Sequence, residues 1–372
     1  MNLRIAGMGW VTPLGRGIDA VWNRLLQGDE AVAQSISDSV ANTTYSAFLA
    51  PTDALKDLPS HPRLRRASAI SRFASAAGLD ALAQARSKIG EIDPEKMALV
   101  FAASNGGVIY TKRFYHDIVE AGAQSASPLL FPETVFNAPA SHLAAILGIT
   151  GTSYTIVGDG AVGLLAIKMA YDLLESGALD FCLVVGAEEA DWILCDAYHK
   201  WRLLKKEPPI ELFGDPARGM ILSEGAGAVL LARDGAVEID AIDGGGNFSH
   251  RDEANRILRR ILHGLEAKHT CIISSANGTF VDLAEREAIR RELPGATVYS
   301  LKAALGESVG ASAIWQVIAG AQAMVTKRLP QIAHSNSSVG LSFPTGNAIS
   351  CEEAIVLSCG LNQQAAGLRL SI

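Results

Sequence analysis

The chain has 372 residues, of which 49% are hydrophobic and 19% charged, a composition typical of a folded protein with a large core. At about 150 residues per domain, this length predicts two domains or one large duplicated domain. The net charge of −7 disfavours a nucleic-acid binder, which usually carries a basic surface. No apolar run reaches the ~18 residues that a membrane span needs, so we expect neither nucleic acid nor membrane as a partner.

Cysteine and histidine spacing excludes several site classes. The five cysteines are an odd number without a C-x-x-C pair, and the eight histidines show neither H-x-x-x-H nor H-E-x-x-H spacing. We therefore expect no disulfide framework, no metal site and no other cofactor. The amino terminus is a poor signal peptide because its short apolar stretch holds Pro13. A reducing cytoplasm is the expected location.

Strand-like and helix-like segments alternate from the amino terminus, as is typical of α/β proteins. In chain order the sequence predicts a strand over 3–7, a helix over 20–26 ending at Gly28, a loop region over 29–62, a helix over 65–88, a strand over 97–102 and a helix over 139–148.

The clearest unit lies in the middle of the chain. A strand over 154–157, a helix over 164–176 and a strand over 181–185 form a βαβ pattern, which predicts a parallel sheet. The helix is apolar around most of its circumference, so we expect it to be buried. The rhythm returns after residue 236, with strands over 271–274, 297–300 and 366–370 and a helix over 311–324. These segments predict two α/β halves, residues 1–235 and 236–372.

The first short motif is a G-x-G-x-x-G match over 158–163, which follows a strand and opens a helix. That context is the one in which helix amides hold a dinucleotide pyrophosphate, and Glu188 at the end of the next strand is a candidate ribose ligand. No complete doubly wound domain follows the motif, however. We favour a tight turn that requires glycines, and dinucleotide binding is the less favoured interpretation.

A second short motif, G-x-S-x-G over 306–310, has the pattern of a hydrolase nucleophile elbow at Ser308. The triad order of α/β-hydrolases requires an acid and then a histidine after the serine. Only His334 follows, with no Asp or Glu between it and Ser308. The motif is therefore interpreted as a glycine-rich turn into a buried helix.

A third pattern extends over the whole chain. Residues 5–15 (IAGMGWVTPLG) resemble the start of elongating β-ketoacyl-acyl-carrier-protein synthases of the thiolase superfamily. Other segments match that family in the same order: Trp22, Leu25 and Gly28, Asn137, Gly151, residues 177–189 (GALDFCLVVGAEE), Phe213, residues 219–227 (GMILSEGAG), Asn277-Gly278-Thr279 and residues 302–310 (KAALGESVG). The resemblance implies a thiolase fold, an α/β architecture of five αβαβα layers with two pseudo-repeated halves, working as a dimer.

The resemblance also assigns the site. In that family a cysteine at a strand-to-helix turn attacks an acyl thioester, and two histidines stabilise the oxyanion that forms. Here Gly160 occupies the cysteine position, and Asn277 and Glu307 occupy the two histidine positions. Lys302, which the family uses to organise the site, is retained. The carboxy-terminal loop, which carries oxyanion and gating features in the family, reads CGLNQQ over 359–364 instead of being rich in Gly and Phe.

These losses predict a subunit without condensing activity. The resemblance is closest in type to the chain-length factor of ketosynthase heterodimers, which pairs with an active β-ketoacyl-acyl-carrier-protein synthase in type II polyketide, aryl-polyene or fatty-acid-like synthesis. An acyl-carrier protein is then reached through the complex. In such pairs the acyl tunnel of the active partner ends at the dimer interface. The candidates for the tunnel end and the interface are Phe131, Phe136 and Asn137, with the two rings as the candidate plug.

Two other interpretations stay open. In the first, the chain is an enzyme with altered chemistry in the same cleft, where Asp159, Glu307 and Lys302 do acid–base work. In the second, it is a homodimeric scaffold that binds acyl groups. A ketosynthase-like decarboxylase with Gln at the nucleophile position is disfavoured, because Gly160 offers no amide side chain.

Overall fold

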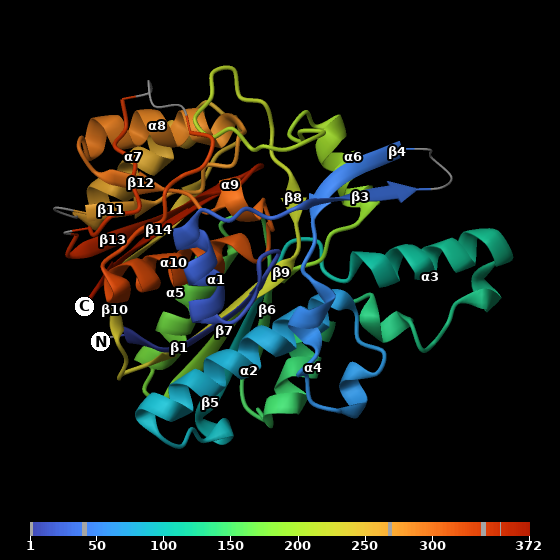
Figure 1. Ribbon diagram of the computed structural model, residues 1–372. Coiled ribbons are helices and arrows are strands. Elements are labelled where there is room, and N and C mark those ends of the chain that lie inside the picture. The colour runs from blue at the N-terminus through green and yellow to red at the C-terminus, as the bar shows by residue number, and fades with distance from the viewer. Residues whose placement is uncertain (1–2, 39–42, 267–269, 336–339, 350) are drawn as a thin grey trace.

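The computed structural model describes residues 3–38, 43–266, 270–335, 340–349 and 351–372 (Figure 1). Its strands are β1 (Leu3–Thr12), β2 (Gly15–Arg16), β3 (Ala33–Asp38), β4 (Thr43–Phe48), β5 (Met97–Ala103), β6 (Ser153–Val157), β7 (Phe181–Glu188), β8 (Leu222–Ser223), β9 (Gly225–Ala232), β10 (Val237–Asn247), β11 (Thr270–Ile273), β12 (Thr297–Tyr299), β13 (Glu353–Cys359) and β14 (Gln364–Ser371). Its α-helices are α1 (Ile18–Gln27), α2 (Ala69–Ile89), α3 (Val108–Ala121), α4 (Ala138–Leu147), α5 (Val162–Glu175), α6 (Trp192–Lys200), α7 (Glu253–Leu265), α8 (Phe280–Glu292), α9 (Lys302–Leu305) and α10 (Ser312–Thr326).

The large sheet repeats one pattern twice. Within the described residues it runs in the order β12-β11-β13-β14-β10-β1-β9-β7-β5-β6. In the first half β6, β5 and β7 are parallel, and β9 and β1 follow antiparallel. In the second half β12, β11 and β13 are parallel, and β14 and β10 follow antiparallel. Antiparallel pairing of β1 with β10 joins the halves.

Helices complete five layers around this pattern (Figure 1). Helices α2 and α4 cover the outer face of the first half, α7 and α8 cover that of the second, and α5 and α10 pack against each other between the halves. The fold is therefore the α/β thiolase-like architecture that the sequence predicts. The expected boundary between residues 235 and 236 falls in the link from β9 to β10 and stays a prediction as a domain boundary.

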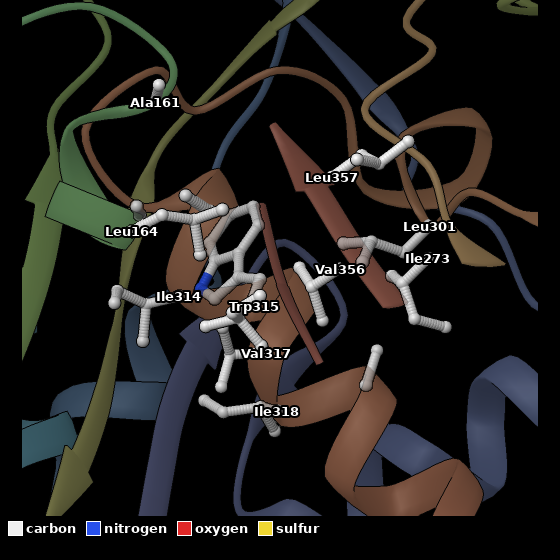
Figure 2. Close-up of a cluster of buried hydrophobic side chains, with 14 of the residues drawn as sticks. Ala161, Leu164, Ile273, Leu301, Ile314, Trp315, Val317, Ile318, Val356 and Leu357 are labelled. Carbon is white, nitrogen blue, oxygen red and sulfur yellow. The ribbon is translucent and has the colours of Figure 1, made fainter. Parts of the chain in front are cut away.

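The central layer is the densest part of the core. Figure 2 shows Trp315 of α10 beside Leu164 of α5, with Val356 of β13 nearby. The two helices come so close at Gly163 that an added Cβ would lie 2.9 Å from the Cβ of Ala313. This contact explains the last glycine of the G-x-G-x-x-G match as a packing requirement. Truncating a buried tryptophan such as Trp315 typically costs about 3–5 kcal/mol.

The expected loop region over 29–62 is wrong in part. Strands β3 and β4 form an antiparallel hairpin there, with Ala33 opposite Phe48, and β4 adds β8 as a parallel neighbour. Tyr45, Ala47 and Phe48 are buried beneath it. The segment is rich in Ser and Thr, so its alternation of inward and outward side chains was hidden by its polarity.

Candidate condensing site

Gly160 lies in the turn from β6 to α5 and is buried. Its carbonyl accepts a hydrogen bond from Ser358 Oγ at 2.7 Å. A Cβ added at Gly160 would lie 3.3 Å from the Cα of Gly360 and 3.5 Å from the carbonyl oxygen of Cys359. The carboxy-terminal loop therefore packs directly on the position that the resemblance assigns to the nucleophile.

The neighbouring Asp159 points into that loop. Its carboxylate accepts the backbone amides of Leu361 at 3.0 Å, Asn362 at 2.8 Å and Gln363 at 3.1 Å, and also that of Gly160. Asp159 was a candidate acid–base group at the sequence level. The structure gives its carboxylate four amide donors, so this side chain is committed to holding the carboxy-terminal loop.

The other three predicted site residues meet in the interior. Lys302 Nζ and Asn277 Nδ2 each donate to Glu307 Oε2 at 2.7 Å. Their strand-to-helix connections bring them there: Asn277 follows β11, Lys302 opens α9, and Glu307 follows α9. The side chains of Lys302 and Glu307 are only 1% and 2% exposed. Glu307 Oε1 is buried without a hydrogen-bond partner among the described residues.

Two further buried carboxylates support this group. Asp282 accepts the amides of Asn277 at 2.7 Å and Phe213 at 2.6 Å, and burial raises the pKa of Asp282 to about 6. Burial also raises the pKa of Glu285 to about 7, although Ser274 and Ser275 donate to it. The sequence analysis assigned no role to either acid. Both lie on α8, directly after Asn277 in the chain, and this position is the signal that could have indicated them.

Cys359 is the cysteine that contacts this site. Its amide donates to Ser275 Oγ at 2.8 Å. Burial, with the charges of Glu285 and Asp159, raises the pKa of the Cys359 thiol well above its usual value. A nucleophilic cysteine needs a lowered pKa, so Cys359 does not replace the missing thiolate. The sequence places Cys359 at the start of the carboxy-terminal loop and assigns it no nucleophilic role, because it lies far from Gly160 along the chain.

The two short motifs have structural roles here. Glu188, the candidate ribose ligand, is buried, and its carboxylate accepts the amides of Ser104 at 3.1 Å and Asn105 at 3.3 Å. Ser308 is fully buried, and its carbonyl accepts the amides of Ala311 and Ser312 at the start of α10. All five cysteines are free, and the described residues contain no His, Cys, Asp or Glu cluster suited to a metal ion.

The candidate interface residues lie outside the core. Phe131 is 56% and Phe136 44% exposed, and Asn137 before α4 is exposed too. The ring of Phe131 contacts that of Phe114 of α3, with ring centroids 5.8 Å apart. Helix α3 has no buried residue and projects from the body of the molecule (Figure 1).

A buried pair anchors the segment that carries these rings. His142 Nε2 on α4 lies 2.6 Å from Glu133 Oε1, and Glu133 also accepts the Ser68 amide at 3.3 Å. Next to it, β6 ends the sheet among the described residues, and its Tyr154 and Val157 are 44% and 48% exposed. An apolar strand with a free edge is a surface that another chain can pair with.

Comparison with known proteins agrees with this geometry. The family model of the β-ketoacyl synthase amino-terminal domain matches residues 2–236, so the chain belongs to the β-ketoacyl synthase family. The 3-oxoacyl-(acyl-carrier-protein) synthase 2 of Vibrio cholerae is 24% identical over 187 residues, covering 50% of this chain and 45% of that protein. The chain thus spans about half the length of that relative. The chloroplastic synthase I of Arabidopsis thaliana is 24% identical, covering 92% of this chain and 79% of that protein.

Solved structures share the whole fold. A β-ketoacyl synthase from Burkholderia phymatum has a TM-score of 0.85 at 20% identity, covering 100% of this chain and 99% of that one. The ishigamide ketosynthase/chain length factor has a TM-score of 0.83 at 18% identity, covering 100% and 98%. A ketosynthase in complex with its chain length factor from Xenorhabdus doucetiae has a TM-score of 0.81 at 18% identity, covering 100% and 98%. Among the described residues no helix is long and apolar enough to cross a membrane.

Proposed function

We propose that this chain is a non-condensing subunit of the chain-length-factor type. It pairs with an active β-ketoacyl-acyl-carrier-protein synthase and shapes that partner's acyl tunnel in type II polyketide or fatty-acid-like synthesis. The observation that carries the proposal is the set Gly160, Asn277 and Glu307, which offers no thiol and no imidazole. Covalent capture of an acyl group needs a nucleophilic atom, and position 160 has no side chain.

The charge at position 307 also argues against condensation. A condensing site stabilises a developing oxyanion with hydrogen-bond donors aimed at it. Glu307 presents an unpartnered carboxylate oxygen instead, and its other oxygen already takes the donors of Lys302 and Asn277. An additional negative charge in this interior would be repelled rather than stabilised.

The free surface supports a partner. Two exposed apolar features lie in the first half of the fold: the edge strand β6 with Tyr154 and Val157, and the half-exposed rings of Phe131 and Phe136. Exposed apolar surfaces of this kind usually mark protein interfaces. The solved relatives named ketosynthase/chain length factor complexes carry the same fold, which favours an active synthase as the occupant.

The tunnel role follows from the two rings. A bulky ring at the closed end of an apolar tunnel limits chain length, because packed interiors tolerate added methylene groups poorly. Phe131 and Phe136 are free to serve this purpose because neither is buried in its own subunit. Asn137 then marks where the interface segment joins α4.

The central experiment co-expresses the tagged chain with the active β-ketoacyl synthase encoded nearest to it. We expect the two to co-purify and to extend carrier-bound chains only together. The isolated chain, incubated with acylated carrier protein, should show no acyl adduct at residue 160 by intact-mass spectrometry. A stable thioester on the isolated chain would reject the proposal, as would a partner that reaches the same products at the same rate alone.

The altered-chemistry enzyme has less support. Its three groups are committed to each other or to backbone amides: Lys302 to Glu307, and Asp159 to the carboxy-terminal loop. The homodimeric scaffold remains an outcome of the same experiment, since a chain that dimerises with itself and binds no synthase would favour it.

A further inference from the structure

The carboxy-terminal loop forms a concave row of backbone amides. Leu361, Asn362 and Gln363 are consecutive, and their amides converge on one carboxylate, that of Asp159. The amide of Gly160 reaches the same carboxylate from the opposite chain segment. Successive backbone amides in this arrangement bind anions, and their hydrogen bonds to an ionised group are about twice as strong as neutral ones.

The loop fits over the carboxylate without space to spare. A Cβ added at Gly360 would lie 2.0 Å from Asp159 Oδ1 and 2.2 Å from Oδ2, so only glycine allows the loop to pass there. The same loop is held from its other side, because Ser358 Oγ donates to the Gly160 carbonyl at 2.7 Å. The carboxy-terminal loop thus covers position 160 and binds the Asp159 carboxylate in the same conformation.

We propose that the amides of Gly160, Leu361, Asn362 and Gln363 form a cradle for a carboxylate or a similar oxyanion, and that Asp159 is its built-in ligand. The bound carboxylate locks the loop over position 160. This inference deepens the proposed function, because it adds a second cause of inactivity to the missing thiol. The donors that would receive an oxyanion beside position 160 are already occupied by the carboxylate of Asp159.

The first test asks whether the cradle binds anions once Asp159 is removed. Asp159→Ala should lower Tm by roughly 2–4 °C, because the amides lose their carboxylate acceptor. Sodium formate at roughly 0.1 M should then restore most of that loss, whereas sodium chloride at equal ionic strength should not. Wild-type Tm should show no difference between the two salts. Asp159→Asn, which keeps an oxygen acceptor without the charge, should lie between the two and serves if Asp159→Ala does not fold.

The matched control is Asp93→Ala. Asp93 also caps a backbone amide, that of Glu95 at 2.9 Å, but it does so on the surface with a single donor. Formate should not stabilise this variant beyond chloride. If formate and chloride act alike on Asp159→Ala and Asp159→Asn, the cradle is rejected.

The second test asks whether the carboxylate seals position 160. Gly160→Cys should react with iodoacetamide no faster than the wild-type cysteines, and Gly160→Cys combined with Asp159→Ala should react at least tenfold faster. In this reaction the thiolate attacks the iodine-bearing carbon, a thioether forms and iodide leaves. Intact-mass spectrometry counts the adducts against the wild-type background. Equal rates for the single and double variants would overturn the sealing role.

Both tests use the isolated chain and small probes. A failed cradle therefore leaves the pairing with a synthase untouched, and a failed co-purification leaves the cradle untouched.

Discussion

The candidate condensing site and the β6 edge differ in whether their side chains have partners within the chain. At the candidate site, the buried Lys302 and Glu307 bind each other, and the half-buried Asp159 binds the backbone of the carboxy-terminal loop. At the edge, Tyr154 and Val157 are apolar and half exposed, on a strand whose outer side faces no neighbour among the described residues. The polar site groups are thus bound mainly to one another and to backbone amides, whereas the apolar groups of the edge are left exposed.

The difference indicates which property the fold retains. A buried ion pair rarely stabilises a protein more than packed apolar residues of the same size would, so Lys302–Glu307 is a poor choice for stability alone. It does neutralise a carboxylate at a position where the resemblance expects histidine. An exposed apolar edge, by contrast, lowers solubility unless something covers it. The two regions together fit a subunit that supplies shape to a partner.

The largest expected effect is on the interior pair. Lys302→Met leaves Glu307 buried without a cation and should lower the free energy of unfolding by about 3–5 kcal/mol. Urea unfolding followed by circular dichroism measures it. The double variant Lys302→Met with Glu307→Gln should recover much of the loss, because no unpaired charge remains. A loss well under 1 kcal/mol for Lys302→Met would show that the pair is not needed to hold the interior together.

A second interior effect depends on pH. Burial first, and then the nearby charge of Glu189, raises the pKa of Glu188 from 4.5 to about 8. The folded chain therefore keeps a proton that the unfolded chain releases, so Glu188 makes stability fall as pH rises from about 4.5 to about 8. Each unit of difference is worth about 1.36 kcal/mol, which makes the full effect a few kcal/mol.

Glu188→Gln tests this assignment because glutamine does not titrate. Its unfolding free energy, measured by urea titration at a series of pH values, should fall less steeply across the window from about 4.5 to about 8 than that of the wild type. Asp180→Asn is a surface control with an unchanged slope. Parallel curves for wild type and Glu188→Gln would contradict the raised pKa.

A substitution at the β6 edge should change association with the partner and leave the free energy of unfolding almost unchanged. Val157→Arg is expected to change the free energy of unfolding by no more than about 0.5 kcal/mol, because the side chain is already half exposed. It should weaken association with the synthase partner at least tenfold, or about 1.4 kcal/mol, by placing a charge on the pairing strand. Analytical ultracentrifugation measures the fractions of monomer and complex, and hence the strength of association. Leu283→Arg on α8, exposed to a similar degree but on the other half, should leave association unchanged.

Sequence patterns predicted the interior better than the edge, for a physical reason. Helix α5 is apolar nearly all round and must be buried wherever it sits, so its βαβ unit was recognised. The family resemblance assigned Gly160, Asn277 and Glu307 to the site because matched motifs fix positions along the backbone, and their role there stays a prediction. The hydrogen bonds between Asp159 and the carboxy-terminal loop were not predicted, because they involve residues such as Asn362, which is 203 residues away in sequence. Helix α3 was missed because it buries no residue and so carries no strong pattern.

The last expected effect concerns the candidate interface rings, where product length should change and stability should change little. Phe131→Ala should cost under about 1 kcal/mol, because the ring is 56% exposed and touches only Phe114 among the described aromatic rings. In the complex, Phe131→Ala and Phe136→Ala should lengthen the carrier-bound products, read by mass spectrometry. Tyr115→Ala, an exposed ring on α3, controls for general damage to the projecting segment. Since each substitution leaves the monomer folded, unchanged product lengths for both phenylalanine variants would remove these rings from the tunnel and leave them only a share in binding.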